Sequence, residues 1–179
     1  MIQQIWTIGH SNYSFEVFLN LLEAFNIQAL ADVRRFPGSK KFPHFNKELL
    51  EDTLSKNNIR YIHFPELGGR RKPSTSSKNT GLRNESFRGF ADYMEEEEFK
   101  TGINRLETIA TEFPTAIMCS EAVWWRCHRS LIADYLKSKG TLVQHILNKK
   151  KTTEHPYTSA ARVENGKLSY PPDHFILIN

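Results

Sequence analysis

The sequence predicts an α/β fold: a three-layer sandwich around a mostly parallel sheet of about five strands, with a small C-terminal β-hairpin. Short apolar runs rich in β-branched residues alternate with longer stretches of helical period. Each pair of runs is separated by enough chain for a crossover helix, which favours parallel pairing. Near the end, Asn165-Gly166 lies between two alternating segments, a strong hairpin signal.

The first half of the chain is predicted to hold three strands, at 3–8, 27–33 and 59–64, and two helices. Ser14 precedes the first helix as its cap. The inward positions of that helix are predicted to be Phe15, Phe18, Leu19, Leu22 and Phe25. Asn46 is predicted to cap the second helix, which continues to about Lys56, and the buried side of that helix is predicted to carry Leu49, Leu50 and Leu54.

The second half opens with residues 65–84, which have neither helical nor strand period. Loops of that length are usually functional or disordered. Helices are then predicted at 85–98, at about 102–113 and at 131–139, with strands at 115–118 and 141–147. The acidic run Glu95–Glu98 is interpreted as a solvated helix end and not as a metal site.

Composition favours one domain over residues 1–179, with residues 150–179 as a hairpin appendage. Two cysteines do not make a disulfide framework, and no apolar run is long enough to span a membrane. The start of the chain lacks the pattern of a secretory signal. We therefore expect a cytoplasmic protein with no membrane partner; the sequence does not indicate an oligomeric state. The net charge of +4 permits an anionic partner without requiring one.

Polar and ionisable residues follow the predicted strands. In a parallel sheet the strands end at one edge, so residues just beyond them meet in space, and α/β proteins bind ligands there. The residues expected at this edge are Gly9, His10, Ser11, Asp32, Arg34, Arg35, His63, Gly68, Gly69, Cys119, Ser120, Glu121 and His145. The sequence therefore predicts a functional site at this edge.

Cys119 ends a buried strand, and Cys127-His128 open the following helix. A thiol beside a helix N-terminus and cationic groups becomes a nucleophile, whereas a free cysteine is equally suited to a small apolar core position. His128 shares a helix face with Leu131 and Ile132, so it is either a satisfied core group or a base or ligand near the strand ends. Both alternatives stay open for each residue.

Two known templates do not fit. Cysteine phosphatases place five residues between cysteine and arginine in a loop that cradles phosphate, whereas six residues without glycine separate Cys119 from Arg126. Zinc deaminases need a second Cys-x-x-Cys half that is absent here. We predict no cofactor; the alternative is a metal ion bound through Cys119, Cys127, His128 and His10.

The loops at the predicted edge are basic and aromatic. Residues 34–45 interleave four basic side chains with three phenylalanines, and residues 65–88 add further lysines and arginines. Such a combination is typical of sites for nucleotides or single-stranded nucleic acid, although solvated loops carry similar charges and the phenylalanines also suit a core. Asp32 and Arg34 form either part of the site or a pair that orients the loop.

Several motifs in order resemble the domain of unknown function 488 family. They are Thr7-Ile-Gly-His-Ser-Asn12, Asp32-Val-Arg34, Phe45-Asn46, Tyr61-Ile-His63, Leu67-Gly-Gly-Arg70, Phe87–Met94, Met118-Cys-Ser-Glu121, Cys127-His-Arg129, His145-Ile146 and Ala161-Arg-Val163. The resemblance covers nearly the whole chain. It implies an α/β domain whose cysteines are suspected of function, and it supplies no reaction.

Two functions follow as hypotheses. The first is an enzyme acting on a nucleotide, nucleic acid or other phosphorylated substrate. Its catalytic candidates are Cys119, Glu121, Cys127, His128, His10 and Asp32, and its substrate-binding candidates are Ser11, Arg34, Arg35, Gly68, Gly69, Arg70 and Arg129. The second is a non-catalytic nucleic-acid-binding module in which the cysteines belong to the core. An anionic small molecule or nucleic acid is the partner expected in either case.

Overall fold

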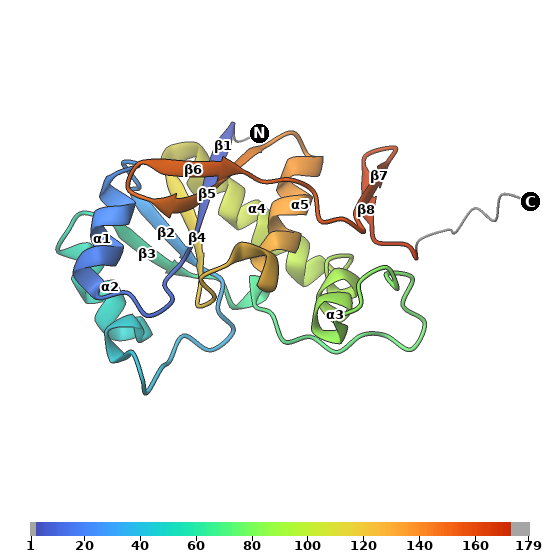
Figure 1. The fold of residues 1–179 in the computed structure, drawn as a ribbon, viewed down its shortest axis with the longest axis horizontal. Helices are drawn as coiled ribbons and strands as arrows, with labels where there is room; N and C mark the ends of the chain where they lie inside the picture. The colour runs from blue at the N-terminus through green and yellow to red at the C-terminus, as the bar shows by residue number, and fades with distance from the viewer. Residues whose placement is uncertain (1–2, 173–179) are drawn as a thin grey trace, which may run out of the picture.

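A six-stranded, mostly parallel sheet forms the centre of the computed structural model, which describes residues 3–172 (Figure 1). The strand order is β3-β2-β4-β1-β5-β6. The parallel strands are β1 (Gln4–Gly9), β2 (Ala29–Asp32), β3 (Arg60–His63), β4 (Thr115–Cys119) and β5 (Leu142–Asn148). The edge strand β6 (Lys151–Glu154) runs antiparallel to β5. The predicted α/β class is confirmed.

Helices cover both faces of this sheet (Figure 1). On one face lie α1 (Phe15–Glu23) and α2 (Lys47–Ser55), and on the other lie α3 (Glu85–Tyr93), α4 (Glu97–Glu112) and α5 (Arg129–Ser138). The strands alternate between these layers: Leu30 and Met118 pack with α1 and α2, while Ala31 and Ile117 pack with the other helices. Two separate apolar cores result.

Local sequence explains the two helix starts in the first layer. The Ser14 hydroxyl accepts a hydrogen bond from the Val17 amide, as expected of a cap. Asn46 also precedes its helix, but its side chain accepts instead from the Ser39 amide, so it orders the preceding loop. The expectation that Leu49 points inward is wrong: it is 48% exposed, whereas Leu50 and Leu54 are buried.

Two other element predictions need correction. The acidic run does not end the helix at 85–98, because α3 ends at Tyr93 and Glu97 and Glu98 form the first turn of α4. Carboxylates there face the positive end of the helix dipole. The strand β6 was not predicted, since Lys-Thr-Thr-Glu lacks apolar alternation and depends on pairing with β5.

The predicted C-terminal hairpin is present as β7 (Arg162–Glu164) and β8 (Lys167–Ser169), beside α5 in Figure 1. Asn165 and Gly166 both have positive φ, as the two-residue turn requires. Within the predicted appendage of 150–179, β6 belongs to the main sheet instead, and residues 173–179 lie outside the described part. No helix in the described part of the chain is both long and apolar enough to cross a membrane.

Candidate functional site

The site lies at the carboxyl ends of two neighbouring strands, β1 and β4, after which the chain continues to opposite faces of the sheet. After β1 the chain passes to α1 on one face, and after β4 it passes to α5 on the other. Such a switch point leaves a crevice outside the carboxyl ends of the two strands. Pairing continues just past the strands, because the His10 amide donates to the Cys119 carbonyl at 3.0 Å and the Ser11 amide to the Ser120 carbonyl at 2.9 Å. His10 and Cys119 are therefore neighbours.

Cys119, Cys127 and His128 form a cluster beside this crevice. Cys119 is the last residue of β4; Cys127 follows the short 3-10 helix η3 (Trp124–Arg126), and His128 precedes α5. Their sulfur atoms and an imidazole nitrogen lie within 4.8 Å of one another. Both cysteines are buried and free. Cys127 Sγ lies 3.7 Å from His128 Nδ1.

The imidazole of His128 has a defined orientation. Its Nε2 lies 3.1 Å from the carbonyl oxygens of both Val33 and Leu67. Carbonyls only accept hydrogen bonds, so we assign the proton to Nε2. Nδ1 then faces the cysteines.

The two thiols differ in acidity. The hydrogen bond from Cys127 holds the pKa of Cys119 well below its usual range against the effect of burial, and His128 and Arg129 add to this. Burial and the neighbouring Cys119 sulfur raise the pKa of Cys127. Cys119 is therefore the thiol of the pair that ionises first, and Cys127 is its hydrogen-bond donor.

Asp32 is completely buried and positions Arg34. One carboxylate oxygen accepts from Arg34 Nε at 2.9 Å and the other from Nη2 at 2.5 Å, while the Tyr61 hydroxyl donates to the second at 2.7 Å. Asp32 does not line the crevice. With its oxygens occupied in this way, it orients the arginine instead of exchanging protons with a bound molecule.

His10 forms a neutral wall of the crevice. Its ring stacks on Phe45 with centroids 4.2 Å apart. Nδ1 lies 2.9 Å from the Ser11 carbonyl and Nε2 3.3 Å from Arg34 Nη1, so Nδ1 donates and Nε2 accepts. Burial, then the charge of Arg34, lowers the pKa of His10 to about 4. Both nitrogens are occupied, which makes His10 a poor general base.

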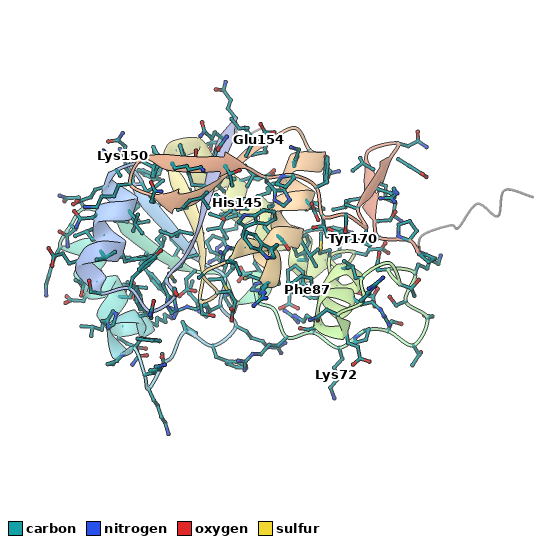
Figure 2. The ribbon with its side chains drawn as sticks, in the orientation of Figure 1. Lys72, Phe87, His145, Lys150, Glu154 and Tyr170 are labelled. Atoms are coloured by element: carbon teal, nitrogen blue, oxygen red, sulfur yellow. The ribbon has the colours of Figure 1, made fainter. Side chains whose placement is uncertain are left out.

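The crevice opens into a pocket of about 690 Å³, which we call the basic pocket. Its lining includes five basic residues, Arg34, Arg35, Lys41, Arg70 and Arg126, and one acid, Glu121. Phe36, Phe42 and Phe87 add aromatic surface; Phe87 is labelled in Figure 2. Cys119, Cys127 and His128 also line it. The pocket therefore combines a positive wall with the sulfur cluster.

Most of the predicted site residues line the basic pocket. They are His10, Ser11, Arg34, Arg35, Gly69, Arg70, Cys119, Glu121, Cys127 and His128. Gly68 does not: a Cβ there would lie 2.9 Å from Arg35 Cα, so this glycine permits close packing.

Arg129 also lies outside the lining, and it is 1% exposed. Its guanidinium donates to the carbonyls of Glu121 at 2.6 Å and Ala122 at 3.1 Å, so it braces the loop after β4 and does not face the pocket. A bound anion in the pocket would not reach it directly.

The expectation that His145 lies at this edge is wrong. The register of β5 places His145 opposite Thr7, two residues before the end of β1. It is buried, hydrogen-bonded to Thr7 at 2.6 Å and stacked on Trp124 at 4.3 Å. Figure 2 shows His145 inside the molecule, near α5.

Sequence reasoning did not identify Asn12, Asn84, Ser86 and Phe87 as pocket residues. The last three belong to the start of α3, where Asn84 accepts from the Ser86 and Phe87 amides as a cap. The capping pattern predicts a helix start, but its place beside the pocket depends on the path of residues 68–84. Asp92 fixes that path by accepting from Ser74, Ser77 and Asn79.

Comparison with known proteins identifies the family. The family model of the domain of unknown function DUF488 matches residues 14–136, more than half of the chain. The chain belongs to the DUF488 family. No curated protein and no solved structure matches it. The DUF488 match spans most of the pocket, from Arg34 to His128, and ends within α5.

Proposed function

We propose that this DUF488 protein is an enzyme acting on a nucleotide or another phosphorylated substrate. The basic pocket would bind the anionic group, and the cluster of Cys119, Cys127 and His128 would be the reacting centre. The DUF488 family assignment supplies no reaction of its own.

The observation that carries the proposal is the charge of the pocket. Asp32 neutralises Arg34, but Arg35, Lys41, Arg70 and Arg126 form no ion pair with a carboxylate among the described residues. Four uncompensated cations around one opening attract an anion strongly. Arginine suits phosphate because its planar fork donates two parallel hydrogen bonds.

The remaining groups fit roles in such a reaction. Cys119, as the thiolate of its pair, supplies a nucleophile or a ligand at the base of the pocket. Glu121 is exposed and lines the opening, where it can exchange protons with a bound molecule. The phenylalanines of the wall offer faces on which a nucleobase stacks.

A second candidate function, non-catalytic binding of nucleic acid, rests on two exposed aromatic residues. Phe36 is 67% exposed and Trp125 57% exposed, and each adjoins an arginine, Arg35 and Arg126. Exposed aromatic rings beside cations suit single-stranded nucleic acid, which a non-catalytic module would bind with steep salt dependence. The two functions differ in turnover and in the need for Cys119.

The test measures binding and turnover separately. Nucleotides and phosphorylated metabolites are expected to raise the melting temperature of the protein, because they bind the native state. Arg126→Gln should weaken binding about tenfold or more, through loss of a charge-assisted hydrogen bond. Lys150→Gln is the matched control, since Lys150 is exposed and lies far from Phe87 in Figure 2.

Turnover decides between the two functions. The compounds that stabilise the protein are incubated with wild type and with Cys119→Ser, and product is followed by chromatography. Loss of turnover in the variant with retained binding supports the enzyme. Binding without turnover in wild type, or equal turnover in the variant, overturns it.

A further inference from the structure

The geometry of the sulfur cluster suits a metal ion. A tetrahedral zinc site, with bonds of about 2.3 Å to sulfur and about 2.0 Å to nitrogen, separates a sulfur from a nitrogen by about 3.5 Å. Cys127 Sγ and His128 Nδ1 are 3.7 Å apart, and the third ligand atom, Cys119 Sγ, lies within 4.8 Å of both. Only small adjustments would bring three ligands onto one ion.

The backbone around the cluster allows two residues adjacent in sequence, Cys127 and His128, to reach the same ion. Adjacent residues within one helix rarely bind the same ion, but Cys127 has an extended backbone between η3 and α5. The chain turns between the two residues, because His128 has helical φ and ψ as the first residue before α5. Their side chains therefore converge although the residues are neighbours in sequence.

The hydrogen bonds of His128 are also those of a metal-binding histidine. Metal-binding histidines usually donate the other ring N–H to a carboxylate or a backbone carbonyl, which fixes the tautomer. His128 donates Nε2–H to Val33 and Leu67, so that Nδ1 faces the sulfurs. Gly69 leaves room for this ring, because a Cβ there would lie 2.8 Å from Nδ1.

Charge around the cluster favours thiolate ligands. Arg129 is buried, has no carboxylate partner among residues 3–172, and its Nε has no hydrogen-bond partner. A buried guanidinium without a counter-ion is costly. Thiolates supply negative charge beside it, and because two thiolates balance one Zn²⁺, the bound ion adds no net positive charge there.

We infer that Cys119, Cys127 and His128 bind a Zn²⁺ ion, with the fourth coordination position open to the basic pocket. On binding, Cys127 releases its thiol proton to solvent, so both sulfurs bind as thiolates. Sulfur and imidazole ligands exclude Mg²⁺ and Ca²⁺, which require oxygen. Three protein ligands and one open position are typical of catalytic zinc, which binds a water or a substrate oxygen there.

This inference rests on the proposed function only for its catalytic role, so metal binding is tested without any substrate. Chelator-treated protein is titrated with ZnCl₂ against a chromogenic zinc chelator, and about one ion per chain is expected. Co²⁺ in place of Zn²⁺ should give a sulfur-to-metal charge-transfer band that identifies thiolate ligands. Uptake with no thiolate band, or no uptake by folded protein, overturns the site.

Variants assign the ligands. Cys127→Ser and His128→Gln should each weaken zinc binding by at least about tenfold. Ser120→Ala should leave zinc binding unchanged, because Ser120 is an exposed residue of the pocket lining and is not one of the three ligands. Circular dichroism of the metal-free variants identifies any that do not fold, and Cys119→Ser then serves as the second ligand variant. Equal zinc affinity in folded wild type and ligand variants overturns the assignment.

Zinc binding and the binding and turnover of phosphorylated compounds test the metal site and the proposed function separately. If zinc does not bind but phosphorylated ligands bind and Cys119-dependent turnover is measured, the metal site is wrong and the enzyme assignment stands. If zinc binds with thiolate ligands but no phosphorylated compound binds, the site is a metal centre and the proposed substrate class is wrong.

Discussion

Gly69 lies so close to His128 that a Cβ on the glycine would come within 2.8 Å of Nδ1. The imidazole cannot easily move away, because Val33 and Leu67 hold its other nitrogen. A residue from the loop after β3 therefore sets the space available to a residue before α5.

Gly69→Ala should disturb the site more than the overall fold. The new methyl group displaces the imidazole and weakens its hydrogen bonds to the two carbonyls, a cost of about 1–3 kcal/mol in unfolding free energy. Urea unfolding checks the cost, and zinc titration checks the site. Gly38→Ala is the matched control, since Gly38 also lines the basic pocket and a Cβ there would meet no atom within 4 Å. Equal behaviour of the two variants would contradict the crowding.

Asp32→Asn should be strongly destabilising. The substitution leaves the buried guanidinium of Arg34 without its counter-ion, which costs about 3–5 kcal/mol. Urea unfolding at neutral pH measures this. Asp52→Asn is the control because it breaks an exposed pair with Lys56 worth about 0.3–0.5 kcal/mol. Comparable losses in both variants would show that Arg34 does not depend on Asp32.

Stability should fall as the pH is lowered from about 6.5 toward 4. Burial, then the charges of His155 and Arg129, lowers the pKa of His145 to about 3. The unfolded chain takes up a proton at His145 near pH 6.5 and the folded chain does not, so acid favours unfolding by about 1.4 kcal/mol per pH unit per histidine. His10, with its pKa near 4, acts in the same direction.

The measurement is a series of urea unfolding curves between pH 7 and 4.5. His145→Gln should reduce the slope of stability against pH by about one proton, although the variant is less stable throughout. Thr7, Trp124 and His155 contact His145, and Arg129 acts on it through its charge. An unchanged slope in the variant would mean that another group takes up the proton.

Tyr170→Phe should loosen the C-terminal hairpin. The buried Tyr170 hydroxyl donates to Asp134 Oδ2 at 2.9 Å, and the loss of a hydrogen bond to a charged group costs about 1.5–3 kcal/mol. Hydrogen exchange at residues 162–169 should speed up, and the unfolding free energy should fall. Tyr157→Phe, at a 39% exposed position, serves as control. Equal exchange in the two variants would show that Tyr170 does not anchor the hairpin.

The sequence predicts the layers of this fold because local periodicity and strand composition decide them. It also predicts that His10, Arg34 and Cys119 lie at one sheet edge, since parallel strands end together. Features set by non-local contacts cannot be predicted in this way. The strand β6 needs β5 as its partner, His145 takes its depth from the register with Thr7, and Asn84 reaches the pocket through the loop that Asp92 orders.

The buried charged residues also divide into those whose contacts local sequence predicts and those whose contacts it does not. Asp32 and Arg34 are close in sequence, and their pairing is one of the two alternatives that the sequence allows. Arg129 is predicted from the sequence to bind an anion, but its partners are two carbonyls seven and eight residues away along an irregular loop. No local pattern indicates that contact.

Within the part of the chain that the structure describes, the Arg129 guanidinium donates hydrogen bonds only to the main-chain carbonyls of Glu121 and Ala122. Because the side chains of Glu121 and Ala122 are exposed and take no part in these hydrogen bonds, both can be exchanged while the backbone keeps its path. Position 9 must stay glycine, since a Cβ there would collide with the Glu121 carbonyl. Positions 121 and 122 are therefore suited to library selection, because the side chains beside Cys119 can be varied while the backbone that carries them is retained.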